Sequence, residues 1–291
     1  MPSLIWNMET ITFNCRFITP AFLGGADPKG TPELRAPSIK GALRFWWRAM
    51  NGYLVKKENG NPTYQYLLKE DEDIFGGIYQ VMQKSPIIVR VVEKNMRYTK
   101  GGDIFRGGQI EGIEYLFYSL KHHKRDDLGF DTESKFDIIF SCREENRDIL
   151  LKALASFWLL VNLGSLGTRA RRCAGAFCID SIEDKMGILQ DRISFFTETD
   201  ETTIDFLKAN FKKISELIGS KKPVLFKKYS LLNQTSPAYL SNQTFSTWQD
   251  AVNSIGGELR STRKGKTSRI KSERTFTIET LDKKAAFGIP G

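Results

Sequence analysis

The sequence predicts an α+β protein built from two ferredoxin-like (RRM-like) βαββαβ domains, with antiparallel sheets and helices packed on one face of each. Through residue 181, segments of period-two and of helical periodicity alternate as strand, helix, strand, strand, helix, strand. A second series of such segments follows, and 291 residues suit two modest domains. We expect a first domain at 1–181 and a second at 182–291. Because the chain ends on AAFGIPG, an apolar segment, both a complete and a truncated second domain are considered.

The first half of the first domain begins with an alternating segment. Residues 8–18 place apolar and polar side chains in turn, which predicts a half-buried strand. The Pro- and Gly-rich residues 19–37 predict a loop, and Ser38 is the expected N-cap of a helix that runs to about Met50. After a mixed helical and loop-rich insertion, the β-branched residues 86–93 predict the second strand.

The second half of the first domain repeats this order more clearly. Residues 135–142 alternate and predict a strand. Residues 144–163 predict a long helix that is nearly apolar toward its end, as expected for a buried helix, and Gly164 is the expected stop. Residues 174–181 predict the closing strand.

The remainder of the chain is less regular. We expect a strand at 192–197, a helix at 202–218 and a helix around 245–256. The segment 260–274 follows with seven basic residues and one acid, so it is interpreted either as a loop that tracks a phosphate backbone or as a solubilising loop.

Charge points to the class of partner. The formal net charge is +9, and basic proteins of this kind favour anionic partners, of which nucleic acid is the commonest. There is no apolar run of the roughly 18 residues that a membrane span needs, and no pattern typical of a signal peptide. Four scattered cysteines do not suit a disulfide scaffold, so a cytoplasmic protein is expected.

The densest cluster for phosphate binding is the Gly/Arg loop, residues 164–175. It holds three glycines and three arginines directly after the predicted buried helix. Glycine lets backbone amides approach a phosphate, and arginine offers a planar fork to its oxygens. We therefore predict backbone contacts from Arg169, Arg171 and Arg172. The alternative is a flexible helix-capping loop with solvated arginines.

A second candidate is the helix that begins near residue 38. At about 100° per residue, Lys40, Arg44 and Arg48 share one stripe. Trp47 borders that stripe, and we interpret it either as a stacking platform for a base or as a core residue. The opposing stripe is expected to face the core and consists of Ile39, Leu43, Trp46 and Met50.

Signals for catalysis are poor. The only histidines, His122 and His123, are adjacent in a charged segment, which is usually surface, although they could act as a general base in RNA cleavage. Cys173 and Cys178 lack zinc-site spacing, so we predict no metal, no cofactor and no catalytic residue. The rival function is a metal-independent endoribonuclease, and a purely architectural protein is a third possibility.

At four segments the chain resembles a known family. These are TPAFLGGAD, RAPSIKGALRFWWRA, LGSLGTRARRCAGAF and AAFGIP, in this order, spanning about residues 11 to 290. They are similar to the repeat-associated mysterious proteins (RAMP superfamily), and more narrowly to the first subunits of the Cmr complex, the type III-B CRISPR effector.

This resemblance implies a non-catalytic RNA-binding subunit with two ferredoxin-like domains. It implies a place near the 3′ end of the guide (CRISPR) RNA, a part in capturing target RNA for antiviral defence, and other RAMP subunits of the Cmr complex as neighbours. RNA cleavage would belong to another subunit. Under the rival interpretation, the resemblance implies a metal-independent endoribonuclease that processes CRISPR transcripts, as members of the same superfamily do with histidines. The residues that we predict to contact RNA are Arg35, Lys40, Arg44, Trp47, Arg48, Arg169, Arg171 and Arg172.

Overall fold

The protein is built around one four-stranded antiparallel sheet. The computed structural model describes residues 7–25, 27, 30–79, 81–106, 110–122, 128–197, 202–218, 232, 237–239, 243–263 and 275–277. The strand order is β4-β7-β1-β8. Counted along the chain, this is second, third, first, fourth, which is the ferredoxin-like arrangement that the order of segments predicts. The strands are β1 (Met8–Phe17), β4 (Ile87–Asn95), β7 (Lys135–Arg143) and β8 (Phe177–Glu183).

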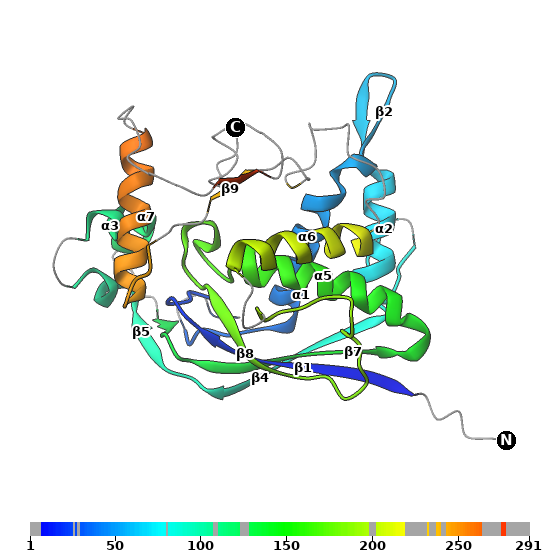
Figure 1. Cartoon of the computed structure of the whole chain (residues 1–291), viewed down its shortest axis with the longest axis horizontal. Helices are drawn as coiled ribbons and strands as arrows, with labels where there is room; N and C mark the ends of the chain where they lie inside the picture. Colours follow the sequence, from blue (N-terminus) through cyan, green and yellow to red (C-terminus); the bar gives the residue numbers. More distant parts are fainter. Residues whose placement is uncertain are drawn as a thin grey trace.

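Three helices lie on one face of this sheet. The crossover helices α1 (Ala36–Asn51) and α5 (Arg147–Leu163) cover the sheet, and α6 (Thr203–Ile218) packs on both of them (Figure 1). The expected α+β class, with an antiparallel sheet and helices packed on one face, is confirmed.

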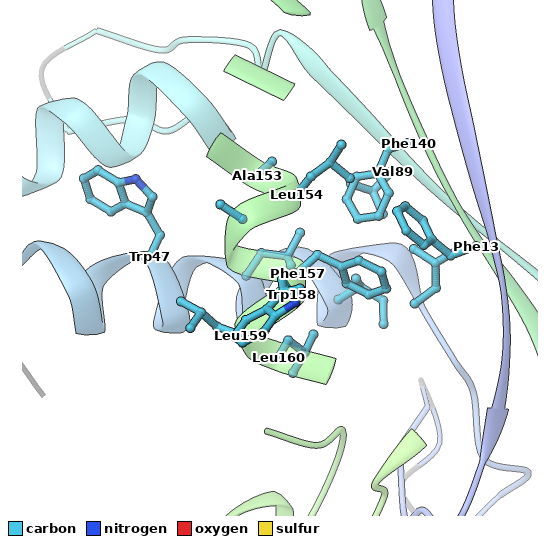
Figure 2. Close-up of a cluster of buried hydrophobic side chains, with 14 of the residues drawn as sticks. Phe13, Trp47, Val89, Phe140, Ala153, Leu154, Phe157, Trp158, Leu159 and Leu160 are labelled. Atoms are coloured by element: carbon cyan, nitrogen blue, oxygen red, sulfur yellow. The ribbon is translucent and has the colours of Figure 1, made fainter. Parts of the chain in front are cut away.

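The core lies between the sheet and α5. Alternation along β1 buries every second side chain, and Phe13 contacts Phe157 with ring centroids 4.8 Å apart. Phe140 of β7 lies 5.2 Å from the same ring. Figure 2 shows these rings meeting between the strands and α5. Because α5 is also covered by α6, it is buried on nearly every side at its apolar end, as the sequence predicts.

The insertions form smaller elements around this unit. Between α1 and β4 lie a hairpin and a helix, and between β4 and β7 lie short strands and helices. They are β2 (Lys56–Glu58), β3 (Asn61–Thr63), α2 (Gln65–Phe75), β5 (Tyr98–Lys100), α3 (Glu111–Leu116), α4 (Tyr118–His122) and β6 (Leu128–Phe130). Single 3-10 turns lie at Gly52–Leu54, Gly101–Phe105, Glu144–Asn146 and Ala170–Arg172.

Two local expectations are wrong. Helix α1 begins at Ala36 with Arg35 as its N-cap, so Ser38 lies inside the first turn, where Pro37 also fits because its missing N–H needs no partner there. Residues 192–197 form no strand. Ile193 and Phe195 instead pack against the core, where the ring centroids of Phe195 and Phe13 lie 4.9 Å apart. The alternating pattern therefore comes from a loop that covers the core.

The described part of 182–291 contains the two expected helices. Helix α6 shares the core of the first sheet, whereas α7 (Trp248–Arg263) packs against α3 around a second apolar cluster. A Cβ on Gly256 would lie 2.2 Å from the carbonyl oxygen of Gly112, so this contact depends on glycine. β9 (Pro237–Tyr239) pairs with β10 (Thr275–Thr277). The division into domains at residue 181 stays a prediction.

Candidate nucleic-acid interface

The Gly/Arg loop is held against the segment that follows β1. Thr168 N donates to Phe22 O at 2.8 Å, and Gly175 N donates to Pro20 O at 2.8 Å. Thr19 Oγ1 donates to Cys173 O at 2.7 Å. Two segments that are far apart in the sequence therefore form one structural unit, which a helix-capping loop alone would not require.

Left-handed backbone shapes this loop. Gly167 and Gly175 have φ of 88° and 71°, and Arg169 and Cys173 also lie in the left-handed region. A Cβ on Gly167 would lie 2.5 Å from Phe22 O, and one on Gly175 would lie 1.9 Å from Leu166 O. The glycines therefore permit both the turn and its close contact with the segment after β1.

The three loop arginines have different environments. Arg169 Nε donates to Ser119 Oγ at 2.7 Å, and its guanidinium lies 4.7 Å from the centre of the Tyr118 ring. Arg171 is exposed. The Nη1 atom of Arg172 is buried and has no hydrogen-bond partner, and none of the three forms an ion pair among the residues that the structure describes. This loop therefore presents cationic groups without carboxylate partners there.

Arg35 lies beside the same segment. Its Nη2 donates to Gly24 O at 3.4 Å, and its Nε lies 3.8 Å from Glu33 Oε2. Gly24 is two residues beyond Phe22, which pairs with Thr168 of the Gly/Arg loop. The fold thus brings Arg35 to the neighbourhood of the loop, although more than 130 residues separate it from Arg169 in the sequence.

The basic stripe of α1 is engaged inside the protein. Asp71 of α2 is completely buried, and its Oδ2 accepts hydrogen bonds from Arg44 Nη1 at 3.0 Å and from Arg48 Nη2 at 2.6 Å. Arg44 Nη2 also donates to the carbonyl oxygens of Phe75 and Gly76. The expectation that these two guanidinium groups face a phosphate chain is corrected, because they bind a buried carboxylate.

Trp47 is a core residue. Its side chain is only 2% exposed, so the expectation of a base-stacking platform at the border of the stripe is wrong. Figure 2 shows the indole pointing from α1 toward α2. The insertion helix α2 covers this side of α1, so α1 has a second buried side that a one-sided amphipathic pattern does not anticipate. Trp46, expected in the core, is half-buried and lies against Gly164.

Lys40 is the remaining member of the stripe. It is half-buried, and desolvation, followed by repulsion from the Arg44 guanidinium, lowers the pKa of its ammonium. This direction reflects the cost of a partly buried charge that has no carboxylate partner among the residues that the structure describes. An added anion would relieve that cost, so Lys40 stays a predicted phosphate contact.

The open face of the sheet does not suit RNA stacking. RRM domains stack bases on aromatic side chains of this face. Here all aromatic residues of the four strands are buried beneath the helices, namely Phe13, Phe17, Phe136, Phe140 and Phe177. The open face instead carries polar pairs, such as Asn14 Nδ2 to Asp137 Oδ1 at 2.7 Å and Arg16 Nε to Asp180 Oδ1 at 2.7 Å. The Gly/Arg loop is therefore the better candidate surface.

Other expected features lie partly outside the described residues. His123 and the side chain of His122 are among these, as are residues 264–274 of the basic segment, whose first four residues belong to α7. Within the described ranges, no group of three or more His, Cys, Asp or Glu side chains could hold a metal ion. No helix there has the length and apolar character to cross a membrane.

Comparison with known sequences identifies relatives. A family model described as the RAMP superfamily matches residues 14–178. CRISPR system Cmr subunit Cmr1-2 of Pyrococcus furiosus is 32% identical over 200 residues, covering 62% of this chain and all of that protein. Subunit Cmr1-1 of the same organism is 26% identical over 230 residues, covering 78% of this chain and 62% of that protein. The chain therefore spans less than two thirds of the second relative.

Solved structures share the fold. The crystal structure of Cmr1 from Pyrococcus furiosus in its apo form has a TM-score of 0.62 at 21% identity, covering 94% of this chain and 79% of that one. A chain of the type III-B Cmr-beta complex bound to cognate target RNA, seen by cryo-EM, has a TM-score of 0.53 at 14% identity, covering 86% and 73%. At these identities the likeness establishes the fold.

Proposed function

This chain belongs to the Cmr1 family of the RAMP superfamily, and from that premise we propose that it is a non-catalytic, RNA-binding subunit of a type III-B Cmr complex. Its partners would be guide RNA, target RNA and other RAMP subunits. In the complex it would lie near the 3′ end of the guide RNA and assist the capture of target RNA in antiviral defence. Two findings support this proposal: the 32% identity to the Cmr subunit Cmr1-2, and the similar fold of a chain in the Cmr-beta complex bound to target RNA.

The observation that carries the proposal is the Gly/Arg loop. It is ordered by contacts with the segment after β1, it exposes Arg171, and it leaves a buried guanidinium nitrogen of Arg172 without a partner. A buried cationic donor without an acceptor is costly, and a phosphate oxygen would supply the acceptor. Arg169 of the same loop adds a third guanidinium, and Arg35 adds a fourth where it donates to Gly24 O in the segment that holds the loop.

The test is a titration of labelled single-stranded RNA with purified protein. Changing Arg171→Ala with Arg172→Ala should weaken binding about tenfold or more, because hydrogen bonds to charged groups contribute about 1.5–3 kcal/mol each. The control is Arg90→Ala with Arg97→Ala, which removes the same charge from exposed arginines of β4 and the residues just after it. That control should change affinity by less than about threefold, through the long-range field alone.

Several outcomes would contradict the proposal. Equal loss in both double variants would mean that net charge, rather than the loop, binds RNA. Absence of RNA binding by the wild type at low salt would favour the architectural subunit. Incubation of the same RNA without metal should give no product, and a defined product that disappears in His122→Ala with His123→Ala would favour the endoribonuclease.

A further inference from the structure

We infer that the turn Gly77–Gln83, which we name the apolar turn, is a docking element that inserts into an apolar pocket with a basic rim on a neighbouring protein subunit. The inference rests on the proposed function, since it requires a protein complex. It adds a protein contact surface to the RNA surface described above. The argument comes from exposure, from rigidity and from charge.

The apolar turn exposes large side chains to an unusual degree. Met82, Ile78 and Val81 are 84%, 80% and 76% exposed, and they are the three most exposed large hydrophobic residues in the described part of the chain. Tyr79 adds a ring that is 47% exposed. Single exposed apolar residues are ordinary, but four within five positions mark an interaction surface.

Hydrogen bonds hold the base of the turn. Gly77 N donates to Gln83 O at 3.0 Å, and Gln83 N donates to Gly77 O at 2.8 Å. Glu72 Oε1 accepts the Tyr79 N–H at 2.7 Å. A Cβ on Gly76, whose φ is 75°, would lie 2.6 Å from Ser85 N, so the turn also needs glycine there. Because these hydrogen bonds already fix the two ends of the turn, fixing those ends on binding costs little further entropy.

Helix α1 contacts the residues that lead into the apolar turn. Arg44 donates to the carbonyl oxygens of Phe75 and Gly76, which directly precede the turn, and its ion pair with Asp71 joins α1 to α2. The basic stripe therefore positions the apolar turn relative to the main sheet. In the inferred docking, Arg44 would therefore act by positioning the turn and not by contacting the neighbouring subunit.

Charge favours a protein over RNA as the occupant. Residues 70–83 carry four acidic side chains and no basic one. Asp71 is neutralised inside the protein, whereas Glu70 is exposed and Glu72 and Asp73 are partly exposed beside the turn. Such a flank repels a phosphate backbone, and it complements a pocket with lysine or arginine at its rim. The Gly/Arg loop has the opposite character, so the two surfaces suit different partners.

The test uses Val81→Ser with Met82→Ser in the full chain. The control is Met186→Ser with Ile255→Ser, which removes side chains that are 50% and 43% exposed elsewhere. Each variant is mixed with the remaining subunits and guide RNA of its own Cmr complex, and incorporation is measured by native mass spectrometry. The apolar-turn variant should be incorporated about tenfold less well or worse, since apolar anchors dominate interface energies. The control should match the wild type, as should the thermal melting of both variants.

Two further measurements separate the alternatives. The isolated apolar-turn variant should bind single-stranded RNA with unchanged affinity, and a photo-crosslinking residue at position 82 should label protein in the assembled complex. Normal incorporation of the variant, reduced RNA affinity or crosslinks to RNA would each overturn the docking inference and leave the RNA-binding proposal in place. A wild-type chain that neither assembles nor binds RNA would overturn both.

Discussion

Helix α1 and the Gly/Arg loop both present arginines at close spacing, yet the protein uses them in opposite ways. Arg44 and Arg48 of α1 share a completely buried carboxylate, Asp71, whereas Arg171 and Arg172 of the loop form no ion pair in the described ranges. This difference shows that a high density of arginines in the sequence does not by itself identify a phosphate-binding site. Phosphate binding requires a guanidinium that is not already paired, and one acidic side chain from a distant segment is enough to pair it.

The origin of that acid explains the difference. Asp71 belongs to α2, which lies in the insertion between α1 and β4. Because α2 packs against α1, a carboxylate in that contact must be paired, and the nearest cations are those of the stripe. At the Gly/Arg loop, Arg169 contacts the Ser119 hydroxyl and the Tyr118 ring of α4, and neither of these is an acid. The contacts of the loop with the segment after β1 are mostly between backbone groups.

The largest expected effect would come from Arg44→Ala with Arg48→Ala. Both changes together leave Asp71 buried without a cation, which should lower the free energy of unfolding by about 4–5 kcal/mol. Arg171→Ala, by contrast, should change it by less than about 0.5 kcal/mol because the side chain is exposed. Urea unfolding of the three proteins checks the comparison. Equal stability in all three would mean that the α1 arginines are as free as those of the loop.

The two adjacent tryptophans of α1 test which side of this helix is buried. Trp47→Ala removes a fully buried indole and should cost about 3–4 kcal/mol of unfolding free energy. Trp46→Ala should cost less than half of that, because the side chain is half-buried against Gly164. Thermal melting of both variants measures this difference, and RNA titration of the folded proteins shows whether either indole also contributes to binding. A larger loss from Trp46→Ala would restore the burial pattern that the sequence alone predicts.

A smaller effect should appear in the salt dependence of RNA binding. Each phosphate contact on single-stranded RNA contributes about 0.7 to the slope of log affinity against log salt. Arg171→Ala should therefore reduce that slope by about 0.7, whereas Arg48→Gln should leave it unchanged because its guanidinium binds Asp71. Titrations at several salt concentrations measure both slopes. A reduced slope for Arg48→Gln would show that this arginine reaches phosphate.

The smallest expected effect is a pH dependence centred on Asp71. Burial raises the pKa of its carboxyl, against the opposing influence of Arg48 and Arg44. A folded-state pKa above the unfolded one gives stability that is present at low pH and is lost as pH rises through the folded value. The melting temperature of the wild type should therefore fall relative to that of Asp71→Asn as pH rises above the ordinary value of 3.8. Parallel curves would mean that no such shift exists.

Much of the central fold could be predicted from local pattern. Alternation in β1 and the continuous apolar end of α5 reflect burial on one or several sides, and both elements appear within a few residues of their predicted bounds. The order of these segments also predicted an antiparallel sheet of ferredoxin-like type, and the four strands pair antiparallel. The loop at 192–197 shows the limit of such patterns, since Ile193 is buried and Phe195 is partly buried against the core without forming a strand.

The family, the α+β class and the Gly/Arg loop could all be predicted from the sequence, because each depends on residues that are contiguous in the chain. Contacts between distant segments were needed to show which arginines are available, that Trp47 is buried whereas Trp46 is half-buried, and that Arg35 donates to Gly24 in the segment that holds the loop. The periodicity of apolar residues along one helix indicates that the helix has a buried side. It cannot report how many neighbours cover the helix, or that one of them brings Asp71, since those contacts join residues that are distant in the chain.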